Sequence, residues 1–134
     1  MGLFKKLIVD AKDYNKVANT VCNVKAILDK VEYEHKPEIS DFLIAAWICR
    51  VGFIDIIEKN EWPMSNKLFI PINGHQTRMT LHEAYMMSIG RLSIKVGELN
   101  DDEIKNAVLN ILDKGEYFYK IDKQIPKDKK EIFI

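Results

Sequence analysis

The segment from Ile39 to Asn60 repeats its apolar positions with the period of an α-helix. At about 100° per residue, these positions gather on one broad face: Leu43, Ala46, Trp47, Phe53, Ile54 and Ile57. The narrower opposite stripe, which is expected to lie nearest water, consists of Asp41, Ala45, Ile48, Gly52, Asp55 and Lys59. A helix that is apolar around most of its circumference belongs inside a protein, so we predict a central helix with the others packed around it. Ser40 is its expected N-cap, and the small residues Ala45 and Gly52 would let a neighbour approach closely.

The N-terminal part predicts a second helix, from about Lys12 to Val31, after a short amphipathic segment from Leu3 to Val9. Its apolar residues are spaced three and four apart and form a seam: Tyr14, Val17, Val21, Val24, Leu28 and Val31. The seam has two interpretations. It packs on the central helix, or it pairs with a second copy of the chain in a homodimer. The first is favoured, because dimeric coiled coils normally sustain three or more heptads.

Residues 68–79 predict a β-hairpin. Its centre is Asn73-Gly74, a pair favoured in two-residue type I′ turns because both positions need a positive φ. Pro71 has no N–H to donate, which places the first strand at an edge. A lone hairpin is marginally stable and needs something to pack on or pair with. Candidate partner strands lie in the C-terminal part, at 116–121 and 131–134.

Two capping motifs predict two further helices. Thr80 and Glu83 form a Thr-x-x-Glu capping box, which opens a helix through about Val96. Asn100 and Glu103 form a similar motif at the start of the last amphipathic helix.

Together these elements predict a mainly α fold. It is a small helical bundle around a central buried helix at about 40–60, with a short hairpin at about 68–79 and C-terminal strands. A length of 134 residues fits a single domain, 1–134, large enough to bury a core. A charged linker at 122–130 and an apolar tail at 131–134 close the chain.

Composition narrows the classes of partner. The 20 Lys and Arg balance the 20 Asp and Glu, which makes nucleic acid an unexpected partner because phosphate neutralisation needs a concentrated basic surface. The longest apolar run, 42–57, contains Arg50 and Asp55 and is too short to cross a bilayer, so no membrane partner is expected. The N-terminus does not read as a secretory signal, and a cytoplasmic location is expected.

Signatures of catalysis are absent from the sequence. It has no phosphate-binding glycine loop, no Gly-x-Ser-x-Gly and no His-Glu-x-x-His. Cys22 and Cys49 lie among apolar neighbours in predicted helices and are expected as small core residues. We therefore predict no cofactor and no metal, and expect binding rather than catalysis.

Arg50 lies in the middle of the most apolar face of the central helix. A guanidinium cannot lose its charge, so a buried one needs carboxylates, backbone carbonyls or an anionic ligand. Glu83 or Glu103 would serve as the carboxylate, and the end of a helix would supply the carbonyls.

A candidate ligand site follows from polar residues near the hairpin. His75 and Arg78 on the hairpin would lie over His82 and Glu83 in the first turn of the next helix. With Arg50 they would surround a small anion, the arginines clamping its charge and a histidine acting as acid–base. The favoured interpretation is structural, with Glu83 serving only as a cap.

Three functions remain in order of preference. The first is a small cytoplasmic protein-interaction module, an adaptor, inhibitor or immunity-type protein that binds another protein or itself as a homodimer. Its candidate interface comprises Tyr14, Val17, Val21, Val24, Leu28, Tyr117, Tyr119 and Phe133. The second is a small anionic-ligand-binding or catalytic domain that uses the Arg/His/Glu cluster. The third and least favoured is a subunit of a nucleic-acid-handling complex.

Overall fold

The computed structural model describes residues 3–34 and 38–112 and has a mainly α fold with one antiparallel hairpin. In chain order its elements are α1 (Leu3–Glu34), α2 (Ile39–Cys49), η1 (Arg50–Ile54), α3 (Asp55–Asn60), β1 (Lys67–Ile72), β2 (His75–Thr80), α4 (Leu81–Tyr85), η2 (Met86–Gly90), α5 (Arg91–Glu98) and α6 (Asp102–Leu112). The predicted helical bundle with a hairpin is confirmed. The predicted strands at 116–121 and 131–134, the linker at 122–130, and Tyr117, Tyr119 and Phe133 lie outside the described residues.

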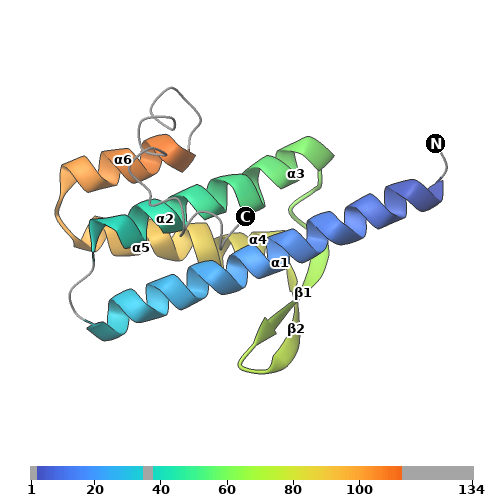
Figure 1. Ribbon diagram of the computed structural model, residues 1–134, viewed down its shortest axis with the longest axis horizontal. Coiled ribbons are helices and arrows are strands. Elements are labelled where there is room, and N and C mark those ends of the chain that lie inside the picture. Colours follow the sequence, from blue (N-terminus) through green and yellow to red (C-terminus); the bar gives the residue numbers. More distant parts are fainter. Residues whose placement is uncertain (1–2, 35–37, 113–134) are drawn as a thin grey trace.

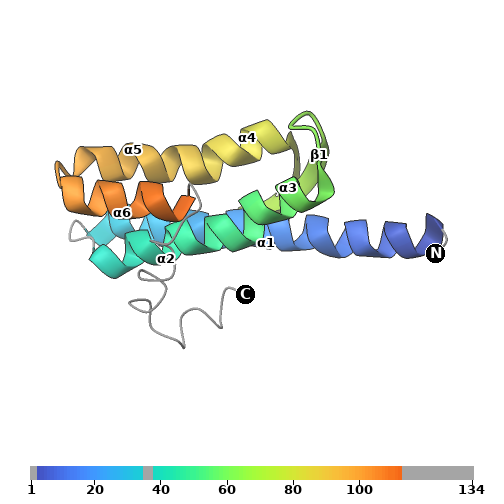
Figure 2. The ribbon, with the colours of Figure 1, turned by 90° about the horizontal axis from the view of Figure 1, so that it is seen from above.

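Three long rods and one short helix make the bundle (Figures 1 and 2). α1 is the first rod, α2–η1–α3 the second, and α4–η2–α5 the third, while α6 folds back against α2. The hairpin connects the second rod to the third and packs on α1 through β1. The N-terminal end of α1 extends past the other elements (Figure 2).

The second rod is the predicted central helix, but its orientation differs from the sequence prediction. The stripe expected nearest water is buried: Ala45 is 0% and Ile48 1% exposed. It contains Gly52, which packs directly against Thr20 of α1. The prediction of close approach at Ala45 and Gly52 is therefore confirmed at Gly52, and the water-facing assignment is wrong. Small side chains marked a tightly packed helix contact, not a solvated surface.

Two π-helical turns interrupt the second and third rods, and neither was predicted. In η1 the N–H of Asp55 donates to the carbonyl of Arg50, and in η2 the N–H of Arg91 donates to that of Met86. These are bonds between residues five apart, where an α-helix joins residues four apart. The buried Ser88 hydroxyl donates to the Ala84 carbonyl at 2.8 Å, which satisfies a polar group inside η2.

α1 is one continuous helix, not a short segment followed by a longer one. The seam Val17, Val21, Val24, Leu28 and Val31 is buried in the core. The interpretation in which the seam packs inside the protein is therefore confirmed. Its valines and Leu28 have no exposed surface to offer, so their assignment to an intermolecular interface is corrected. Tyr14 is half-buried and stacks on Trp62, with 4.0 Å between ring centroids.

The hairpin follows its sequence closely. Lys67 pairs with Thr80 and Ile72 with His75, and the turn residues Asn73 and Gly74 have φ of 50° and 81°. Both positive values match the predicted type I′ turn.

The helix caps agree with the sequence at one of three positions. The Thr80–Glu83 capping box is present, with the Glu83 N–H 3.1 Å from the Thr80 hydroxyl. At α6 the cap is Asp101, not Asn100, because the Asp101 carboxylate accepts the N–H groups of the first turn. At α2 the helix begins at Ile39 after Glu38, so Ser40 lies inside the first turn and is not the N-cap.

Candidate functional site

Arg50 has two protein partners. Its Nε lies 2.8 Å from Oδ1 of Asp55, and its Nη1 donates to the carbonyl of Leu112 at 3.2 Å. Leu112 is the last residue of α6, where a cation also interacts favourably with the helix dipole. The helix-end carbonyl expected from the sequence is present, whereas the carboxylate partner is Asp55 and not Glu83 or Glu103. These contacts explain the arginine without a ligand.

We expect Arg50→Met to lower the free energy of unfolding by about 1–2 kcal/mol. The Arg50 side chain is only 11% exposed, but its partner Asp55 is 45% exposed and would be solvated once left alone. Urea denaturation of both proteins at matched slope measures the difference. Asp55→Asn is the control for the ion pair and should cost less than about 1 kcal/mol. A loss of about 3–5 kcal/mol would indicate a stranded buried carboxylate, and no loss would favour an unpaired arginine kept for a ligand.

The four polar residues near the hairpin do not converge on one point. His75 and Arg78 are exposed and separated by three positions along β2. Because successive strand residues alternate between faces, these two side chains leave the hairpin on opposite sides. His82 is exposed in the first turn of α4, and Glu83 is occupied by the capping box. Arg50 contacts α6, which lies away from the hairpin in both views (Figures 1 and 2).

A different surface carries the clearest hollow in the described chain. Two adjoining hollows, of about 260 and 530 Å³, lie between α1 and β1 and share Asn15 and Phe69 in their walls. We call this surface the α1–hairpin groove. Its lining residues are Ala11, Tyr14, Asn15, Ala18, Asn19, Lys67, Leu68, Phe69, Pro71 and Gln76.

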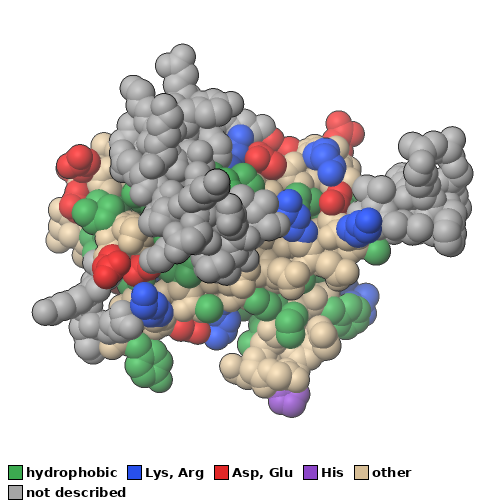
Figure 3. All heavy atoms as spheres, viewed as in Figure 1, with side chains coloured by type: hydrophobic (Ala, Val, Ile, Leu, Met, Phe, Trp, Pro, Cys, Tyr) green, Lys and Arg blue, Asp and Glu red, His purple; other side chains and the backbone are tan. Residues whose placement is uncertain are grey.

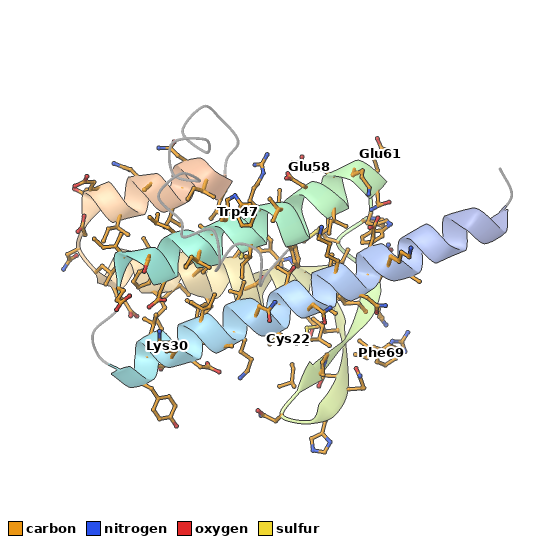
Figure 4. The ribbon with its side chains drawn as sticks, viewed as in Figure 1. Cys22, Lys30, Trp47, Glu58, Glu61 and Phe69 are labelled. Carbon is orange, nitrogen blue, oxygen red and sulfur yellow. The ribbon has the colours of Figure 1, made fainter. Side chains whose placement is uncertain are left out.

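Phe69 is the most prominent apolar side chain of the groove. Its side chain is 61% exposed, and Figure 4 shows it beside the hairpin, clear of the core. The strand explains its position, since Leu68 and Ile70 point inward and are buried. Cys22 of α1 lies 3.4 Å from the Pro71 carbonyl, which ties β1 to α1 at the end of the groove.

The groove is suited to binding and poorly suited to acid–base chemistry. Its lining residues include no histidine, carboxylate or cysteine. The amides of Asn15, Asn19 and Gln76 each offer both donors and acceptors. Burial raises the pKa of the Cys22 thiol, against the opposing charge of Lys25, and burial raises that of Cys49 strongly, so neither is an activated nucleophile. Among the described residues, no group of three or more His, Cys, Asp or Glu could hold a metal ion.

The sequence did not predict this groove. Asn15 and Asn19 are typical of the solvated side of an amphipathic helix, and Phe69 is an ordinary strand residue. One signal was present: residues 68–72 are apolar at almost every position, although a hairpin with one buried face needs apolar residues only at alternate positions.

The chain matches no protein-family model, and searches of curated proteins and of solved structures found no match. Across residues 3–34 and 38–112, no helix has the length and apolar character needed to cross a membrane. Function is therefore argued from the groove itself.

Proposed function

We propose that this chain is a small protein-interaction module that binds another protein through the α1–hairpin groove. The observation that carries the proposal is Phe69, a large aromatic side chain that is 61% exposed in the wall of a hollow. Single exposed apolar residues are ordinary on protein surfaces. Phe69 differs because a concave surface beside it would bury a partner's side chains together with its own ring, as aromatic residues do in binding hot spots.

The same surface favours binding over catalysis. Its polar groups are mainly neutral amides, which orient a ligand but do not exchange protons near neutral pH. An adaptor, an inhibitor or an immunity-type protein would act in this way. A cytoplasmic setting fits the two free cysteines, Cys22 and Cys49, because free thiols persist in reducing compartments.

Site-specific photo-crosslinking tests the proposal. We expect p-benzoylphenylalanine in place of Phe69 to form a discrete crosslinked product in the cells that produce the protein. The matched control carries the same crosslinker at Ile94 of α5, because Phe69 and Ile94 are both 61% exposed. Ile94 lies outside the groove and should give no such product.

The crosslinked partner is then identified by mass spectrometry, purified and titrated with the uncrosslinked protein. Phe69→Ala should weaken this binding roughly tenfold or more, since full burial of a phenylalanine contributes about 1.5–3 kcal/mol. Equal labelling from both positions, or binding that Phe69→Ala leaves unchanged, would reject the groove as the docking site. A product containing two copies of the chain would identify a homodimer.

A further inference from the structure

The positive charges of the described residues fall into two groups. Away from the groove, most lysines and arginines lie within ion-pair distance of a carboxylate: Lys25, Lys30, Arg50, Lys59, Arg91 and Lys95. Arg91 shows the pattern, with Nη2 2.8 Å from both Asp29 and Glu32. The hydrogen bond from Lys25, together with Arg91, holds the pKa of Asp29 below its ordinary value.

The cations around the groove have no such partners. Lys67 lines the groove, and Arg78 is the cross-strand neighbour of Phe69. Lys12 and Lys16 are exposed on α1, each directly after a lining residue. None of these four forms an ion pair within residues 3–34 and 38–112. Elsewhere in that part of the chain only Lys105 of α6 shares this condition.

Carboxylates are also absent from this part of the sequence. Residues 62–82 contain a lysine, an arginine and two histidines but no aspartate or glutamate. Figure 3 accordingly shows no acidic side chain on the hairpin at the lower edge of this face. In a chain with zero formal charge, the groove is thus a locally basic surface around an exposed aromatic ring.

The shape of the groove limits what fits there. Two adjoining hollows of about 260 and 530 Å³ form a trough between a helix and a strand. Amides line both sides, with Asn15 and Asn19 on α1 and Gln76 on β2. Because an amide both donates and accepts, it can bind the N–H and C=O groups of an extended peptide.

We propose that the α1–hairpin groove binds an extended acidic segment of a partner protein. The segment's backbone contacts the amides, an apolar side chain packs on Phe69, and its Asp or Glu residues pair with Lys12, Lys16, Lys67 and Arg78. This inference rests on the proposed function and names the chemistry of the partner. Charge complementarity of this kind speeds association and selects partners.

Single-stranded nucleic acid fits the groove less well. Such sites stack successive bases on several aromatic side chains along a basic channel. Here Phe69 is the exposed ring, because Tyr14 stacks on Trp62 and its hydroxyl accepts a hydrogen bond from Asn66. A ligand that stacks along its length would find one platform.

The test is an NMR titration of the isotope-labelled full chain with a short synthetic peptide of alternating acidic and apolar residues. We expect shifts in the side-chain amides of Asn15, Asn19 and Gln76. Affinity should fall as salt is raised. Lys67→Gln combined with Arg78→Gln should weaken binding roughly tenfold. The matched control is Lys105→Gln, which removes an unpaired lysine outside the groove and should leave affinity unchanged.

Three results would overturn the inference. The first is no shift of these amides at millimolar peptide, and the second is equal binding of a peptide with Asn and Gln in place of Asp and Glu. The third is tighter binding of oligothymidylate at the same amides, which would assign the groove to nucleic acid. If crosslinking at Phe69 identifies a protein partner while the acidic peptide fails, the interaction module stands and only its partner's chemistry is wrong.

Discussion

Gly52→Ala is expected to destabilise the protein by about 2–3 kcal/mol, although glycine is normally a poor helix residue. A Cβ at position 52 would overlap the Thr20 hydroxyl and lie 3.1 Å from Thr20 Cβ and Cγ2. Thr20 is 3% exposed, and its hydroxyl donates to the Lys16 carbonyl at 2.8 Å, so it has little room to move. The midpoint of urea denaturation should therefore fall at constant slope.

Two further variants separate this clash from a general effect of alanine. Gly97→Ala, on α5, meets nothing within 4 Å and should raise stability by about 0.5–1 kcal/mol through helix propensity. Thr20→Ala removes the hydroxyl and methyl groups that position 52 would meet. Gly52→Ala should then cost at least about 1 kcal/mol less in the Thr20→Ala background. A Gly52→Ala protein as stable as wild type would mean that α1 and η1 are not in close contact.

The Gly52 contact also matters for the groove. It fixes α1 against the second rod, and α1 supplies one wall of the α1–hairpin groove through Asn15 and Asn19. A displaced α1 would move that wall relative to Phe69. We therefore expect the packing of the core to set the geometry of binding.

Local features of the sequence predicted structure well. The Asn73-Gly74 turn and the Thr80–Glu83 box are each made by neighbouring residues, whose preferences act within one turn. The Asn100 prediction failed for a related reason: Asp101, one residue later, was an equally good cap, and Asn100 instead takes a left-handed φ of 53°.

The partner of Arg50 could not be read from a regular helical pattern. Residues five apart lie about 140° apart around an α-helix, which places Asp55 far from Arg50. The π-turn η1 widens the helix at this point and brings both the backbone groups and the side chains of these residues together. The second partner, the Leu112 carbonyl, depends on where α6 packs.

The groove was missed because its two walls are distant in the chain. Asn15 and Phe69 come together only when α1 packs on β1, and each alone has an ordinary local explanation. The unpaired state of Lys67 and Arg78 likewise depends on which carboxylates the fold places elsewhere. Such features follow from tertiary structure and not from periodicity.

Val24→Asp is expected to unfold much of the protein. Val24 is 0% exposed in the seam of α1, and a carboxylate there would have no partner among its apolar neighbours. Burying such a group costs more than about 4 kcal/mol, a large share of the 5–15 kcal/mol that stabilises a typical domain. Circular dichroism and urea denaturation would show the loss of helix and of cooperativity.

The matched control for this substitution is Ala26→Asp on the same helix. Ala26 is exposed, so the same charge should cost less than about 1 kcal/mol there, mainly through helix propensity. Sedimentation measurements distinguish the two interpretations of the seam. A Val24→Asp protein that stays folded with an unchanged urea midpoint but sediments as half the wild-type mass would place the seam at a dimer interface. Loss of folding without a folded monomer assigns the seam to the core, and leaves the α1–hairpin groove as the surface on which α1 meets a partner.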